Sequence, residues 1–120
     1  AMVRGAFEYQ GQKCSAMSRA YIPKSIWDQV KEKFVDEVKT IKVGPPEDFS
    51  NFMNAVIDKS AYDSIIDFIK FAKDSKDAEI ITGGEYNDEK GYFIEPTTIL
   101  TEKPKSRSVR WPVVKLSTNL

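Results

Sequence analysis

The sequence predicts an α/β domain in which a layered, parallel or mixed sheet carries flanking helices. Strand-like and helix-like segments alternate along the 120 residues, an order that favours parallel pairing in at least part of the sheet. Apolar residues recur with helical spacing over 26–38 and 65–72, whereas 78–82 has the β-branched content of a strand. Because a parallel sheet is normally covered on both faces and only two long helices are predicted, we expect further chain to pack against it.

The first predicted elements are a short helix that arrives at Cys14 and a strand over 18–22. Gly11, just before the cysteine, permits close packing or an unusual backbone angle. Apolar and polar positions alternate in the strand, and Pro23 closes it. We expect this strand to be buried.

The clearest element is the amphipathic helix that follows. Ser25 is its expected N-cap, and charged side chains occupy the face opposite the apolar one. Gly44-Pro45-Pro46 is expected to end the helix, because proline lacks an amide hydrogen and restricts the residue before it. A loop then runs to Phe52. The apolar face repeats every four positions, at Ile26, Val30, Phe34 and Val38.

A second helix is expected to start near Ser60, where Ser60 and Asp63 have the spacing of a capping box. The polar residues 74–77 end it. Its apolar stripe consists of Ile65, Ile66, Phe68, Ile69 and Ala72.

The last third of the chain is predicted to be mostly extended. Residues 78–82 form a strand that meets a turn at Gly83-Gly84, and 87–91 form another turn. Residues 92–100 follow as an extended segment, in which Pro96 indicates a sheet edge or a bulge.

Charge and composition exclude several functions. Lys and Arg together number 18 and balance 18 Asp and Glu, so no net field attracts nucleic acid or an anionic membrane. No apolar run is long enough to suggest a membrane span. With one cysteine and no histidine, the sequence predicts no disulfide framework, no zinc or other metal site and no Cys-His protease dyad. We expect a soluble, intracellular protein.

Cys14 is the strongest candidate for covalent chemistry. A thiolate is the reactive form of cysteine, and Lys13 or a nearby helix dipole would lower the thiol pKa if either lay close in space. A single cysteine near a helix end is, however, more often a buried and inert thiol. The residues alone therefore leave Cys14 as a candidate nucleophile.

The residues around Cys14 resemble the catalytic-cysteine signature of the aldehyde dehydrogenase superfamily. The matching run is Phe7-Glu8-Tyr9-Gln10-Gly11-Gln12-Lys13-Cys14-Ser15-Ala16, followed by Ser18-Arg19. Its Gln-Lys-Cys-Ser-Ala portion is similar to the pyrroline-5-carboxylate (glutamate γ-semialdehyde) group of that family. The likeness runs from about Gly5 to Ser108, a minor part of a full-length enzyme. Further similar stretches are Ile41–Pro45, Glu47–Phe49, Ala55–Asp58, Gly83-Gly84 and Gly91–Thr97.

The resemblance implies a covalent mechanism and a set of site residues. Cys14 would attack the carbonyl carbon of glutamate γ-semialdehyde, hydride would pass to NAD, and water would release glutamate from a thioester. The backbone amide of Cys14 would be half of an oxyanion hole. Ser15 would hydrogen-bond the substrate carboxylate, although on chemistry alone it is as readily a polar turn residue. The resemblance also implies a mitochondrial matrix location.

Several parts of the family's machinery lie outside this sequence. In the family, the general-base glutamate, an oxyanion asparagine and the nucleotide-binding domain precede the cysteine, and a Glu-Phe-Gly-Pro segment follows it. We therefore expect 1–108 to be a partial catalytic domain and 109–120 to be a divergent C-terminal tail. No Gly-x-Gly-x-x-Gly motif is present, and Gly83-Gly84 is expected to be a turn. We expect the isolated chain to bind NAD poorly and to oxidise no aldehyde, which an assay for NADH would test.

Two classes of function therefore stay open. The first is an oxidoreductase whose activity belongs to a larger parent chain. The second is a non-enzymatic interaction module that uses an open sheet edge and apolar faces to bind itself, as a homo-oligomer, or intact subunits. A thiol redox sensor at Cys14 is a third possibility, and it would need an intermolecular partner because the chain has no second cysteine.

Overall fold

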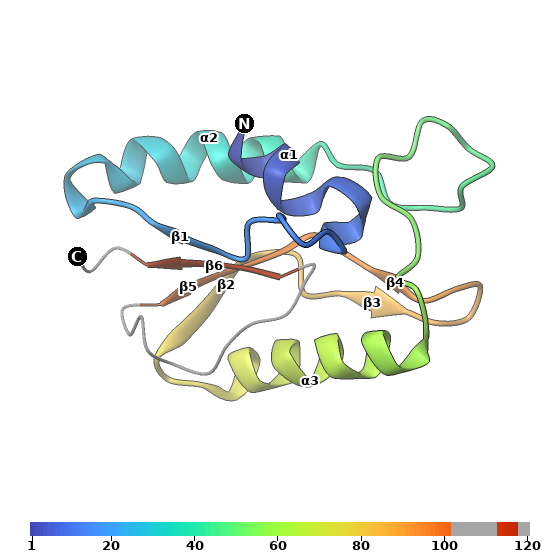
Figure 1. Ribbon diagram of the computed structural model, residues 1–120. Coiled ribbons are helices and arrows are strands. Elements are labelled where there is room, and N and C mark those ends of the chain that lie inside the picture. Colours follow the sequence, from blue (N-terminus) through green and yellow to red (C-terminus); the bar gives the residue numbers. More distant parts are fainter. Residues whose placement is uncertain (102–112, 118–120) are drawn as a thin grey trace.

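The protein is built in three layers around a four-stranded sheet (Figure 1). The computed structural model describes residues 1–101 and 113–117. Helices α1 (Met2–Phe7) and α2 (Trp27–Lys39) cover one face of the sheet, and α3 (Lys59–Asp74) covers the other. The sheet contains β1 (Arg19–Tyr21), β2 (Ala78–Thr82), β5 (Thr97–Thr101) and β6 (Val113–Ser117). The predicted layered α/β architecture is confirmed.

The sheet is mixed, as predicted. Its strand order is β1-β6-β5-β2, in which β6 runs parallel to both β1 and β5, and β2 runs antiparallel to β5. A separate antiparallel pair joins β3 (Tyr86–Asn87) to β4 (Phe93–Ile94), with the predicted turn between them. β6 was not predicted as a strand, and it belongs to the segment expected to be a divergent tail.

Two apolar clusters fill the spaces between the layers. The first cluster lies against α3. Most of the predicted α3 stripe is buried in it, together with Tyr62. Its members are Val56, Tyr62, Ile65, Ile66, Ile69, Ala72, Ile94 and Ile99. The second cluster lies beneath α1 and α2 and contains Val3, Ala6, Phe7, Ile22, Phe34, Val38 and Met53. This second cluster anchors the N-terminal segment that leads to Cys14.

Helix α2 begins and ends differently from the prediction. Ser25 lies inside a short 3₁₀ turn, η2 (Lys24–Ile26), and no side chain caps the helix, so the predicted role of Ser25 is wrong. The helix ends at Lys39, before the Gly44-Pro45-Pro46 run. Its last turn is closed by Thr40, whose hydroxyl donates to the carbonyl oxygen of Glu37 over 2.7 Å. A local side-chain contact therefore ends the helix before the prolines are reached.

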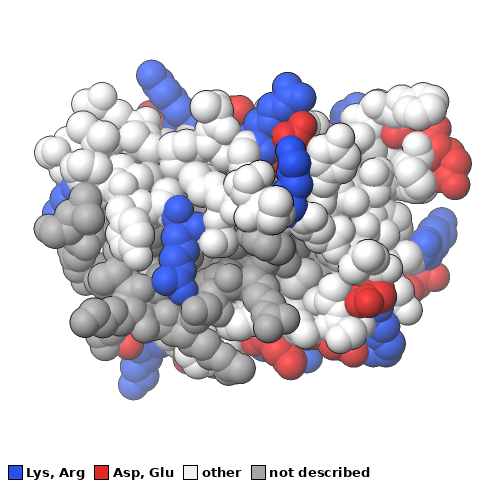
Figure 2. Space-filling model, in the orientation of Figure 1, with Lys and Arg blue, Asp and Glu red and all other residues white. Residues whose placement is uncertain are grey.

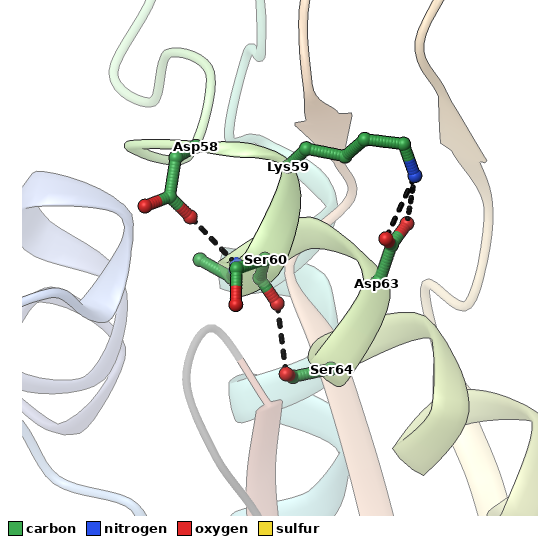
Figure 3. Close-up of polar contacts among 6 residues, drawn as sticks. Asp58, Lys59, Ser60, Asp63 and Ser64 are labelled. Atoms are coloured by element: carbon green, nitrogen blue, oxygen red, sulfur yellow. Dashed lines mark hydrogen bonds and ion pairs between the residues drawn. The ribbon is translucent and has the colours of Figure 1, made fainter.

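Helix α3 is capped by Asp58, two residues before the predicted cap (Figure 3). The Asp58 carboxylate accepts a hydrogen bond from the amide of Ala61 over 2.7 Å. The predicted capping box of Ser60 and Asp63 is wrong, because Ser60 already lies within the helix. The Asp63 carboxylate instead forms an ion pair with the Lys59 ammonium at 2.7 Å. The extended backbone of Asp58, with φ of −156°, makes it the last residue outside the helix.

This assignment predicts different outcomes for two alanine substitutions. Asp58→Ala should lower the free energy of unfolding by about 1 kcal/mol, because one amide of the first turn loses its acceptor. Ser60→Ala should change it by only a few tenths of a kcal/mol, since alanine suits a helix interior. Urea denaturation followed by circular dichroism measures both, and equal losses would contradict the assignment.

Of the two positions predicted for Pro96, a sheet edge or a bulge, the edge is wrong. β5 lies between β2 and β6, and Pro96 sits just before it, near a register shift between Ile80 and Thr82 of the neighbouring β2. The burial predicted for the first strand is largely wrong. β1 pairs only with β6 among the described strands, and its Arg19 and Tyr21 are exposed. In the strand predicted over 18–22, only Ile22 is buried, with 5% of its surface exposed.

Candidate active site

Cys14 lies in a tight turn on the surface. The turn spans Lys13–Ala16 and is closed by a hydrogen bond of 3.0 Å from the amide of Ala16 to the carbonyl oxygen of Lys13. Cys14 and Ser15 occupy its two central positions, and both are exposed. The predicted helix does not reach the cysteine, because α1 ends at Phe7 and a 3₁₀ turn, η1 (Glu8–Gly11), follows.

The backbone before this turn adopts an uncommon conformation. Tyr9, Gln10 and Gly11 have φ angles of 54°, 59° and 68°, all in the left-handed region. Glycine adopts this region freely, whereas other residues pay on the order of 1 kcal/mol or more. Two consecutive non-glycine residues there store strain directly upstream of the cysteine. Such strain persists only where neighbouring structure holds it.

Several contacts hold the turn in place. The amide of Met17 donates to the carbonyl oxygen of Gly5 over 3.0 Å, which ties the end of the turn to α1. Phe7, at the end of α1, is fully buried. Gln10 and Gln12 contact the backbone of 55–57 through their side chains. The turn is therefore anchored at both ends while its central residues stay accessible.

The charged end of Lys13 contacts Glu8 and Tyr9. The Lys13 ammonium lies 4.0 Å from the Glu8 carboxylate and 5.5 Å from the centre of the Tyr9 ring. Arg4 also pairs with Glu8, at 3.3 Å. All of these side chains are substantially exposed, so each contact contributes little to stability.

The backbone amide of Cys14 is available as a donor. It makes no hydrogen bond within residues 1–101 and 113–117. A free amide beside an exposed sulfur is the arrangement that stabilises an oxyanion formed when the sulfur adds to a carbonyl. The hydroxyl of Ser15 follows in the same turn and is likewise exposed.

A pocket of about 480 Å³ lies between α3 and the β3–β4 hairpin. Tyr62 lines this pocket, and burial raises the pKa of the Tyr62 hydroxyl. Neither Cys14 nor Ser15 is among its lining residues, so this pocket is separate from the turn of Cys14.

Other kinds of site find no support in residues 1–101 and 113–117. No group of three or more Cys, Asp or Glu side chains there is arranged to hold a metal ion. None of the helices described has the length and apolarity needed to cross a bilayer. On the face drawn in Figure 2, basic and acidic side chains are interspersed around the rim.

The Gly83-Gly84 turn is not arranged as a phosphate cradle. Gly83 and Gly84 form the predicted turn, with φ angles of 75° and 97°. The amide of Gly84 already donates to the Thr97 hydroxyl over 3.0 Å, so it is not free to bind a phosphate. The carbonyl oxygen of Pro96 fills the space beside the Cα of Gly83.

Comparison with known proteins identifies the family. Residues 1–113 match the model of the aldehyde dehydrogenase family, so this chain belongs to that family. The match includes the turn of Cys14 and nearly all of the described structure. The resemblance seen in the sequence is thereby confirmed.

Within the family, the chain is similar to pyrroline-5-carboxylate dehydrogenases. It is 54% identical over 107 residues to the mitochondrial delta-1-pyrroline-5-carboxylate dehydrogenase of Dictyostelium discoideum, covering 89% of this chain and 19% of that relative. It superimposes on the crystal structure of the Mycobacterium tuberculosis enzyme of that name with a TM-score of 0.89 and 36% identity, covering 97% of this chain and 22% of that one. The structure of the same enzyme bound with NAD gives 0.88 and 37%, covering 97% and 21%.

The chain spans about a fifth of the length of the relatives that it matches. The partial catalytic domain expected from the sequence is consistent with this share. Gln10 and Gln12, whose contacts hold the turn, were not singled out in the sequence, because their partners lie 45 residues away. In the sequence, these two glutamines were marked only by their place in the motif that resembles the family's cysteine signature.

Proposed function

We propose that this chain supplies the nucleophile of a pyrroline-5-carboxylate dehydrogenase, which oxidises glutamate γ-semialdehyde to glutamate. The observation that carries the proposal is the exposed turn of Cys14, whose amide has no partner among the described residues, within a segment 54% identical to a dehydrogenase of that name. Several such relatives are named mitochondrial, and mitochondrial location is part of the proposal.

The proposed role of the turn is to form and hold the covalent adduct. The Cys14 thiolate adds to the aldehyde carbon, the C=O π electrons move to oxygen, and a hemithioacetal oxyanion results. The backbone amide of Cys14 donates to that oxyanion, a contact worth about 3 kcal/mol of barrier reduction in comparable sites. Exposure of the turn allows a substrate to approach from solvent or from a neighbouring domain.

NAD is the proposed cofactor of the whole enzyme, on the ground that a structural neighbour is described as bound with NAD. The Gly83-Gly84 turn does not fit a dinucleotide phosphate, since the Gly84 amide is already bound to Thr97. The steps that we propose for this chain are those at sulfur. The isolated chain should form no NADH from the aldehyde.

An exchange of segments tests the proposed function. The 107-residue segment of the Dictyostelium enzyme that matches this chain is replaced by the chain's own residues, which leaves the remaining 81% of that enzyme in place. NADH formation from glutamate γ-semialdehyde is then followed by absorbance. We expect turnover in this chimera and none in the isolated chain. A folded chimera that binds NAD but forms no NADH would contradict the proposal.

Ser15 is proposed to hydrogen-bond the carboxylate of the substrate. In the same chimera, Ser15→Ala should raise KM for glutamate γ-semialdehyde about tenfold, because a hydrogen bond to a charged group contributes roughly 1.5–3 kcal/mol. KM for an aldehyde of similar length without a carboxylate should not change. Equal increases of KM for both aldehydes would indicate that Ser15 supports the turn and does not bind the substrate carboxylate.

A non-enzymatic interaction module is the second candidate. It is favoured by two apolar side chains on the surface, Phe49 at 97% and Ile57 at 80% exposed. A mass measurement in solution separates the candidates, because a 13.6 kDa monomer at high concentration would weaken this one.

A further inference from the structure

Two glutamine side chains tie the turn of Cys14 to a distant segment. Gln10 Nε2 donates to the carbonyl oxygen of Ala55 over 3.3 Å, and the amide of Ile57 donates to Gln12 Oε1 over 2.9 Å. The two contacts use opposite ends of the carboxamide, one as a donor and one as an acceptor. The backbone partners therefore fix which end of each side chain must face 55–57.

The segment that they contact is held from its other side. Val56 is 4% exposed, and its amide donates to the carbonyl oxygen of Tyr92 over 2.9 Å. Asp58, the next residue after Ile57, caps α3. Residues 55–57 are thus attached to both the β4 region and α3, and they offer a fixed support for the glutamines.

The two glutamine contacts can hold the strained backbone upstream of Cys14 in place. Tyr9 and Gln10 are held in the left-handed region, which non-glycine residues leave unless the surroundings prevent it. Gln10 lies within the left-handed run and Gln12 directly follows it, so their contacts hold the run at its middle and at its end. Relaxation of that run would redirect the chain as it enters Lys13–Ala16 and would turn the sulfur.

We propose that Gln10 and Gln12 are positioning residues that fix the turn of Cys14 for attack on the aldehyde. The inference rests on the proposed function for the role of the sulfur. Attack on a carbonyl requires the reacting atoms within a narrow range of distance and angle, and small displacements are costly. The glutamines touch neither substrate nor sulfur and act through the backbone.

The geometry predicts opposite responses to the same substitution. Gln12→Glu keeps an oxygen that accepts the Ile57 amide, whereas Gln10→Glu removes a donor and places a carboxylate against the Ala55 carbonyl. Gln29→Glu, at an exposed position of α2, is the matched control for added charge. This asymmetry reports which end of each carboxamide makes its contact.

Hydrogen exchange by NMR in the full 120-residue chain tests the inference without turnover. Gln10→Glu and Gln12→Leu should each accelerate exchange of the Ala16 amide, which closes the turn of Cys14, about fivefold, the effect of one neutral hydrogen bond. Gln12→Glu and Gln29→Glu should leave it near the wild-type rate. The Ile69 amide, in the buried part of α3, reports whether the fold is intact.

The chimera supplies the second readout. Gln12→Leu should lower kcat about fivefold or more with KM for NAD unchanged, and Gln12→Glu should restore it. An unchanged Ala16 exchange rate in both Gln10→Glu and Gln12→Leu would overturn the inference, as would equal damage from Gln12→Glu and Gln12→Leu. Because exchange needs no activity, an inactive chimera would contradict the proposed function and leave the positioning test intact.

Discussion

Cys14→Ser in the chimera should lower kcat for glutamate γ-semialdehyde at least about a thousandfold. The serine hydroxyl has nearly the size of the thiol but stays protonated at neutral pH, so it is a far weaker nucleophile than a thiolate. Because Cys14 is exposed in a turn, the substitution should leave the fold and the affinity for NAD unchanged. Stopped-flow absorbance of NADH measures the first turnover directly.

A matched substitution guards this result against a general loss of the turn. Ser18→Ala, a few residues downstream of the turn, should retain kcat within about a factor of two, because our proposal gives Ser18 no contact with the substrate. If Cys14→Ser kept more than a tenth of the parent rate, the sulfur would not be the nucleophile. The proposed function would then fail at its central atom.

Gly83→Ala should destabilise the protein by roughly 3–5 kcal/mol, an effect large compared with the stability of a domain this size. A Cβ at Gly83 would lie 2.3 Å from the carbonyl oxygen of Pro96 and 2.9 Å from the Cα of Thr97. Both are backbone atoms, which cannot rotate away. The φ angle of 75° adds the cost of a left-handed alanine.

Gly5→Ala is the control for this prediction. Gly5 lies within α1, and a Cβ there would meet no atom within 4 Å. Alanine is favoured over glycine in a helix by about 1 kcal/mol, so this variant should be slightly more stable than the parent. Urea denaturation followed by circular dichroism compares the two. A loss below about 1 kcal/mol for Gly83→Ala would mean that the β2–β3 connection can rearrange.

The sequence predicted the features that depend on local periodicity. Phe34 and Val38 of the α2 repeat are buried, as are Ile65 and Ile69 of the α3 stripe. Ile26, the first position predicted for the α2 repeat, lies before the helix and is 45% exposed. The turns at 83–84 and 87–91 were also correct, since glycine and asparagine mark them chemically. These signals lie within a few residues of the structure that they predict.

Features that depend on distant partners were missed. Ser60 and Asp58 are both suitable caps, and only the path of the chain into α3 selects Asp58. The strand β6 lies between β1, which is distant in the sequence, and β5. From its sequence alone, this segment was predicted to be a divergent tail. The left-handed backbone of Tyr9 and Gln10 had no local signal, because neither residue type favours it.

The candidate site likewise has residues that the sequence predicted and residues that only the structure revealed. Cys14 and Ser15 were found from a contiguous motif, and the structure places them together in one turn; their chemical roles stay predictions. Gln10 and Gln12 were part of that motif, but their partners at 55–57 become visible only in the folded chain.

The order β1-β6-β5-β2 bears on how this segment is made by the ribosome. β1, which follows Cys14 by a few residues, hydrogen-bonds as a strand only to β6 among the described strands, and β6 is translated roughly a hundred residues later. Within the described residues, β1 therefore gains its strand partner only after nearly the whole segment has emerged, and pairing across such a separation forms slowly. We expect partly translated segments that end before β6 to aggregate more readily than the full 120 residues.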